Sequence, residues 1–343
     1  MQVVYYDIFD VNEEEAFSES EAKRIDREID VFVEEMERGT RSEVHVDGAI
    51  NELQMRRLLS LVARSRGVKK LGFRHWGMGD LGCFLLVELF ATITESSGSL
   101  GMGRIEELSI RSCGITSKGT SVLLSTLQRY HGLVKLDLGR NNLQNAWEQH
   151  DWVGALHHTI PRLELQELDL SAVNMDVISI DAILSGLHNN GHCLRSLDIS
   201  HNIESLASLL ELLEPHLPHI RIRHLMLTKG ASSASCVEIS QVPLLKRFAD
   251  GVAKNQDLIS LGYFSVLPID RQSSMEEQLI HRRGMEQLRR VQFVLDRNRF
   301  IPWLKAQHRA ACLPQALRKS FGSRSSHSAA FHVLRECSDC LGC

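Results

Sequence analysis

The stretch Leu133-Val-Lys-Leu136-Asp-Leu138-Gly-Arg-Asn141-Asn-Leu143 decides the fold of this chain, because its pattern of leucines recurs along the sequence. A repeat has to be sought before any other feature, since overlooking one misassigns the whole architecture. The shared pattern is L-x-x-L-x-L-x-x-N/C. Clear further copies begin at Ile105, Leu165 and Leu194, weaker ones begin at Val68, Ile222 and Leu258, and a degenerate first copy contains Val44-His-Val46.

The copies are regularly spaced. Their second apolar position falls at residues 44, 71, 108, 136, 168, 197, 225 and 261, and four of the seven steps are 27 to 29 residues long. The alternation around each pair of leucines predicts a strand with one buried face. Leu206, Leu209, Leu210 and Leu213 show the helical spacing of the intervening stretches. Such units bury their apolar faces by stacking, so the repeats predict a curved solenoid with one continuous core.

With these motifs the sequence resembles the leucine-rich repeat family, in its ribonuclease-inhibitor-like subtype, over roughly Ser42 to Phe300. The resemblance implies an α/β solenoid shaped like a horseshoe. Parallel strands would line the concave face, helices the convex face, and a helical cap would cover each end. Val173 stands where the motif has Asn or Cys, and Glu204 where it has an apolar residue, so the turns there are expected to differ.

The chain divides into four predicted segments. These are an acidic helical N-terminal cap (1–41), a leucine-rich-repeat domain of about eight repeats (42–300), a C-terminal capping segment (301–313) and a flexible basic tail rich in Ser and Cys (314–343). Residues 13–38 predict an amphipathic helix. A second predicted helix, Met285–Phe300, is expected to end before Pro302, because proline disfavours helix in the residue before it.

Composition narrows the class of protein. The chain has 343 residues, of which 43% are hydrophobic and 24% charged, which is typical of a soluble globular protein. Its formal net charge of −4 gives no basic field for nucleic acid. The longest apolar stretch, Leu81–Ile93, is too short to span a bilayer. With no secretory signal visible, we expect a cytoplasmic protein with reduced thiols, and a nuclear one stays open.

Three motifs could carry chemistry, but each has a simpler interpretation. Gly77-Met-Gly79-Asp-Leu-Gly82 has the spacing of a dinucleotide fingerprint, yet in the repeat frame it is an ordinary turn into a helix. The histidines lack zinc-site spacing, so we predict no metal and no cofactor. Cys340 has the position of a prenylated cysteine, but Gly342 and a terminal Cys suit that modification poorly. We therefore predict that the chain is not an enzyme, although an unrecognised site stays open.

The outward strand positions form the candidate binding face. One row runs His45, Gly72, Ser109, Asp137, Asp169, Asp198, Met226 and Gly262, so three aspartates stack in consecutive repeats. Lys70, Glu107, Lys135 and Glu167 alternate in sign beside them and could pair across strands. The aspartates either attract a basic partner or hydrogen-bond neighbouring backbone, and both interpretations stay open. The candidate partner-binding residues on this face are Arg74, Arg111, Lys135, Asp137, Arg140, Glu167, Asp169, Asp198 and His201.

The resemblance also bears on function. It implies a non-catalytic scaffold that binds one or more partner proteins through the concave face. Other members of this subtype imply two narrower alternatives, a regulator of a small GTPase of the GTPase-activating type and a regulator of actin filament ends.

Overall fold

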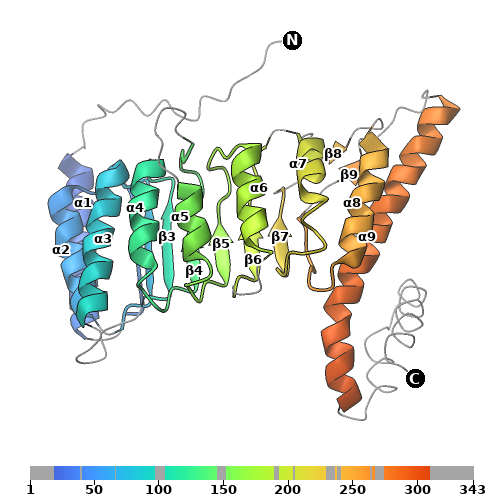
Figure 1. Cartoon of the computed structure of the whole chain (residues 1–343). Coiled ribbons are helices and arrows are strands. Elements are labelled where there is room, and N and C mark those ends of the chain that lie inside the picture. Colours follow the sequence, from blue (N-terminus) through green and yellow to red (C-terminus); the bar gives the residue numbers. More distant parts are fainter. Residues whose placement is uncertain are drawn as a thin grey trace.

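The computed structural model describes residues 19–38, 41–65, 67–96, 105–144, 152–188, 193–203, 205–228, 236–237, 241–262, 265–266 and 274–309. Within them, short strands alternate with helices along most of the chain (Figure 1). In chain order the elements are α1 Glu19–Glu37, β1 Glu43–Asp47, α2 Glu52–Arg64, β2 Lys70–Arg74, α3 Gly79–Ser96, β3 Glu107–Arg111, α4 Ser117–Leu127, β4 Lys135–Asp137, α5 Trp152–Thr159, β5 Glu167–Asp169, α6 Val177–Gly186, β6 Ser196–Asp198, α7 Leu206–Leu213, β7 His224–Met226, β8 Cys236–Val237, α8 Val242–Lys254, β9 Ser265–Val266 and α9 Met275–Arg309.

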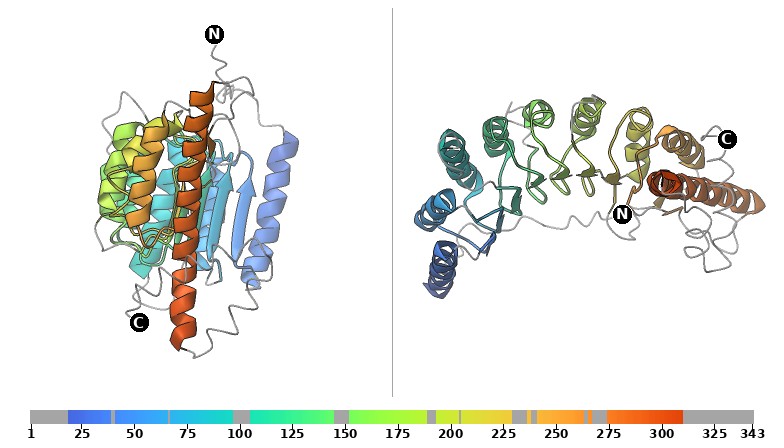
Figure 2. Two further views of the ribbon diagram at one scale, coloured as in Figure 1. Left: turned by 90° about the vertical axis from the view of Figure 1, so that its right-hand side faces the viewer. Right: turned by 90° about the horizontal axis from the view of Figure 1, so that it is seen from below.

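One parallel sheet runs through the molecule in the order β1 to β7. Its register pairs the second apolar position of each copy with that of the next, from Val44 through Leu136 to Leu225. Figure 2 shows the resulting arc, with the strands on the inner side and the helices on the outer side. The predicted α/β solenoid is therefore confirmed. The eighth copy lies beside β7, where an isolated bridge pairs His224 with Ser260.

The core lies between the sheet and the layer of helices. The inward leucines of every strand are buried, among them Leu136 and Leu138, which are fully enclosed. From the helical side, Leu123, Leu124 and Leu127 of α4 are equally buried. Each repeat thus presents its apolar stripe to its neighbours, as stacking requires.

The motif asparagines hold the turns that follow the strands. Asn141 is buried, and its side-chain amide donates to the carbonyls of Ile110 and Leu138 at 2.7 Å each. Asn202 makes the equivalent hydrogen bonds two copies later, where its side-chain amide donates to the carbonyls of Leu170 and Ile199. Its Oδ1 accepts the backbone N–H of Val173 at 2.9 Å. The turn at Val173 is therefore held by the neighbouring repeat, and the valine itself fills the core.

Helices cover both ends of the array. At the N-terminal end, α1 buries Ile25, Ile29, Phe32 and Met36, which together form the apolar stripe of an amphipathic helix. At the other end, α9 packs along α8 and buries Val291 and Val294 (Figure 1). The predicted end of this helix before Pro302 is wrong, because α9 continues to Arg309. A proline inside a helix lacks a backbone donor and crowds the preceding turn, but here the helix extends past it by about two turns.

Candidate protein-binding face

The outermost row of the concave face is a chain of ion pairs. Lys70 Nζ lies 2.9 Å from a carboxylate oxygen of Glu43 and 3.4 Å from one of Glu107. Lys135 Nζ lies 3.0 Å from Glu167. The hydrogen bond with Glu43 raises the pKa of Lys70, and the one with Glu167 raises the pKa of Lys135. Cross-strand pairing of these alternating charges, a prediction from the sequence, is thereby confirmed.

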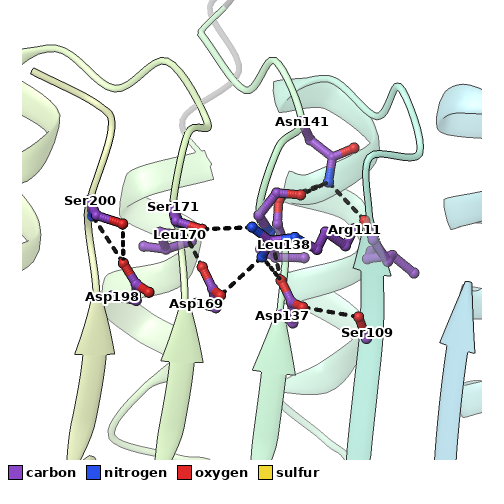
Figure 3. Close-up of polar contacts among 12 residues, drawn as sticks. Ser109, Arg111, Asp137, Leu138, Asn141, Asp169, Leu170, Ser171, Asp198 and Ser200 are labelled. Carbon is purple, nitrogen blue, oxygen red and sulfur yellow. Dashed lines mark hydrogen bonds and ion pairs between the residues drawn. The ribbon is translucent and has the colours of Figure 1, made fainter. Parts of the chain in front are cut away.

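The three stacked aspartates hydrogen-bond the backbone of their own turns (Figure 3). An Oδ1 atom accepts from the N–H two residues ahead in each case, at 2.9 Å for Asp137, 2.8 Å for Asp169 and 3.0 Å for Asp198. Asp198 is buried and also accepts from the hydroxyl of Ser200 at 2.6 Å. Of the two interpretations of this row, backbone hydrogen bonding is the one that the geometry shows.

Arg111 neutralises two of these carboxylates. Its Nη1 lies 3.3 Å from Asp137 and 3.0 Å from Asp169, and its Nη2 donates to the hydroxyl of Ser171 at 3.2 Å. The guanidinium lies across Gly139, where a Cβ atom would come within 2.4 Å of Nη1. Each of the three charged side chains is less than a quarter exposed. Arg111 therefore compensates the acidic row from within the molecule, and the bare backbone at Gly139 makes room for it.

Arg74, Arg140 and His201 lie at the carboxyl edge of the same sheet and are exposed. Within the described part of the chain, their side chains form no ion pair or hydrogen bond, in contrast to those of Arg111 and Lys135. Arg74 borders a hollow of about 310 Å³ on the concave side of β1 to β3. Gly72 and His45 also line this hollow, and the ring of His45 occupies the space that a side chain at position 72 would need. Among the described residues, these three are the side chains of the predicted set that remain available to a partner.

The glycine-rich segment before α3 serves packing. Gly77 and Gly79 have φ values of +70° and +51°, which suit glycine. A Cβ atom on Gly82 would lie 2.6 Å from the indole of Trp76, so the glycine lets that ring pack against the helix. Asp80 accepts the N–H and hydroxyl of Thr116 at 2.8 and 2.7 Å, which brings a carboxylate to the start of α4. The turn interpretation from the sequence thus has a physical basis at each of these positions.

A chain of histidines joins the fifth and sixth repeats. His216 is buried, with Nδ1 2.9 Å from Nε2 of His188 and Nε2 2.9 Å from Oδ1 of Asp181. The ring of His219 stacks 5.2 Å from that of His188. Burial and the neighbouring imidazoles lower the pKa of His188. Both ring nitrogens of His216 are engaged by protein, and no group of three or more ligands placed to hold a metal occurs among the described residues.

Two further predictions concern the cysteines and the absence of a membrane-spanning helix. Cys83 and Cys113 are buried thiols, and burial raises the pKa of Cys113 to about 12. They are therefore unreactive small apolar groups, as expected for reduced cysteines. Cys340 and the rest of the predicted tail, 314–343, lie outside the described residues. None of the helices in the described ranges combines the length and apolar content that a membrane crossing requires.

Comparisons with known proteins give a partial sequence match to a protein whose name includes this kind of repeat. No family model matches the chain. A mouse protein (Mus musculus) named NACHT, LRR and PYD domains-containing protein 14 is 36% identical over 107 residues, which is 31% of this chain and 10% of the mouse protein. The chain thus spans about a tenth of this relative's length.

Among solved structures, the tropomodulin C-terminal domain from Caenorhabditis elegans aligns over 77% of this chain and 95% of its own, at 11% identity and a TM-score of 0.24. A likeness of that size carries no argument about function. The register of the sheet, the asparagine-held turns and the mouse sequence match are findings on which the assignment rests. The chain therefore folds as an α/β solenoid of the leucine-rich-repeat type.

Proposed function

We propose that this chain is a non-catalytic scaffold that binds a partner protein through the concave face of its sheet. The observation that carries the proposal is the in-register parallel sheet β1 to β7, which presents a large curved surface with its polar rows already ordered. A preformed surface loses little conformational entropy on binding. The ribonuclease-inhibitor-like subtype, the cytoplasmic location and the four-segment division stay predictions.

The contacts on this face sort its residues into two groups. Arg111, Asp137 and Asp169 stabilise one another, and Asp198 holds its own turn, so these side chains keep the surface in shape. Arg74, Arg140 and His201 have no such task and can form new ion pairs with a partner. Desolvated arginines are frequent hot spots of protein interfaces. We therefore place the centre of recognition at the carboxyl edge of the sheet.

The test is affinity purification from native cell extract with the intact chain, followed by mass spectrometry. The double variant Arg74→Glu and Arg140→Glu should lose the captured protein while its circular dichroism spectrum stays unchanged. The matched control is Arg129→Glu, a charge reversal at an exposed position after α4 on the convex side, which should retain the partner. Retention by the double variant and loss by the control would place the site on the helices and contradict the proposal.

The two narrower alternatives, regulation of a small GTPase or of actin filament ends, stay predictions. Identification of the captured protein discriminates between them. GTP turnover by the captured GTPase, or filament elongation with the captured actin, would then be measured with and without the chain.

A further inference from the structure

Among the described residues, the charges at the carboxyl edge of the sheet are unbalanced. The described carboxylates at this edge have partners, since Asp47 lies 3.2 Å from His75, Asp80 accepts from Thr116, and Asp176 accepts the N–H of Ser179 at 2.7 Å. By contrast, the exposed side chains of Arg74, Arg140 and His201 have no ion pair or hydrogen bond among the described residues. The edge therefore offers two guanidinium groups and one imidazole, all of which can donate N–H groups, to an anionic ligand.

The spacing of Arg74, Arg140 and His201 along the sheet suits an extended chain. Arg74 ends β2, Arg140 lies three residues past the end of β4, and His201 lies three residues past the end of β6. The three residues therefore come from alternate strands of the sheet. Two strand spacings amount to about 10 Å. An extended peptide advances about 3.3 Å per residue, so three residues also cover about 10 Å. The fitting ligand is thus a segment whose carboxylates are three residues apart.

We propose that residues 1–18 of this same chain are that ligand and bind along the carboxyl edge. These residues lie outside the described part, and their sequence contains five carboxylates and no Lys or Arg. Asp7, Asp10 and Glu13 follow one another at intervals of three. The proposal pairs Glu13 with Arg74, Asp10 with Arg140 and Asp7 with His201.

The connection to the solenoid places the segment at the correct edge. Helix α1 ends at Glu37 and β1 begins at Glu43, so the helix runs antiparallel to the strand, and its first residue, Glu19, lies at the carboxyl edge. The twelve residues from Glu19 back to Asp7 can span about 40 Å. The distance from β1 to β6 is five strand spacings, about 24 Å. The segment is therefore long enough to reach Arg74, Arg140 and His201.

Tethering makes these contacts effective. Exposed ion pairs are individually weak, but a short linker raises the local concentration of a ligand to about the millimolar range. The contact should weaken as salt screens the charges. This inference deepens the proposed function and rests on it for one consequence, namely that the segment competes with an acidic partner for Arg74 and Arg140.

The test uses the full chain with the photoreactive residue p-benzoyl-phenylalanine in place of Phe9. Irradiation at low salt should join residue 9 to the turns after β4 and β6, mapped by mass spectrometry within a monomeric product. The variant Arg74→Gln with Arg140→Gln, and separately the variant Asp7→Asn, Asp10→Asn with Glu13→Gln, should each reduce that product at least about fivefold, as should about 0.5 M salt. Arg129→Gln should leave it unchanged.

Three results would overturn the inference: cross-links that map to the convex helices, a yield insensitive to Arg74 and Arg140, or a product that is only dimeric. The last result would mean that the segment binds a second copy. Because no outside partner takes part in this experiment, its failure is distinguishable from that of the proposed function. Loss of partner capture by the charge-reversal variant would still support the proposed function.

Discussion

Asn141 shows how a single side chain fixes a repeat. Its amide nitrogen donates to the carbonyls of Ile110, Leu138 and Gly139, and its oxygen accepts the N–H of Cys113 at 2.8 Å. The residue is 1% exposed, so water cannot replace these bonds. An unsatisfied buried polar group costs about 1–3 kcal/mol. We therefore predict that Asn141→Ala lowers the free energy of unfolding by about 3 kcal/mol, measured by urea denaturation followed by circular dichroism.

The adjacent residue supplies the control for this prediction. Asn142 is exposed and accepts one hydrogen bond from Asn174 at 3.3 Å. Asn142→Ala should change the free energy of unfolding by less than about 0.5 kcal/mol. Equal effects of the two substitutions would show that the buried amide does not stabilise the turns as described.

Residue roles were predictable where the motif is intact. Asn141 and Asn202 stand at the conserved position of the pattern within this chain's own repeats, and both hold turns. Asn255 and Asn298 also hold turns near the last copies. Asn255, for example, donates to the carbonyl of Leu217 at 2.6 Å. The sequence around these two asparagines departs from the repeat pattern, so their roles were not predicted. The role of Gly139 was also missed, because the sequence does not reveal that Arg111 reaches across two strands.

At the scale of elements, the histidine chain links α6 to the turn after α7. When both rings are neutral, the hydrogen bonds can run in one direction: His188 donates to His216, and His216 donates to Asp181. If both rings were doubly protonated, two N–H groups would face each other between His188 and His216. The groups that face His188 are His216, His219 and, through His216, Asp181. The contact therefore requires at least one neutral imidazole.

Acid should weaken this link between repeats. Burial lowers the pKa of His188 in the folded chain below its value near 6.5 in the unfolded chain. The unfolded chain therefore binds the proton first, and stability that is full above about pH 6.5 is lost as the pH falls through the folded pKa. We predict that the melting temperature falls between about pH 7 and pH 5, and that His188→Gln makes this dependence shallower.

The control for the pH series is His131→Gln, because His131 is an exposed histidine on the connection after α4. Its pH dependence should match that of the unsubstituted chain in calorimetry at each pH. An unchanged slope in His188→Gln would show that other groups carry the acid sensitivity of the array.

Elements differ in how far the sequence determines them. Strand register followed from the repeat alone, because a shift by one residue would expose every leucine of a strand. Helix ends were harder to predict. The proline at position 302 suggested an end, but α9 runs from Met275 to Arg309. The sequence did not reveal that Arg74 and Arg140 lack a partner among the described residues, because that depends on which side chains turn toward each other.

At the scale of the whole molecule, stability is a sum over neighbours. Each helix packs chiefly on the helix before and after it, and each strand on adjacent strands, as the contacts of α3 with α4 and of α8 with α9 illustrate. In such an array a defect at one end should stay local. A defect in a single globular core would instead spread through the whole domain. The solenoid thus makes a prediction about where a terminal substitution is felt.

Asn298 is the substitution site for this test. It is buried in α9 and donates to the carbonyls of Asn255 and Leu258 at 2.9 and 2.8 Å, which fastens the last helix to the array. In Asn298→Ala, amide hydrogen exchange should accelerate about tenfold or more in α8 and α9, which corresponds to about 1.4 kcal/mol, and stay unchanged in β1 to β3. Gln292→Ala, at an exposed position of the same helix, should leave both regions unchanged. Equal acceleration from β1 to α9 would mean that the repeats unfold as one cooperative unit, and the neighbour-by-neighbour description would then be wrong.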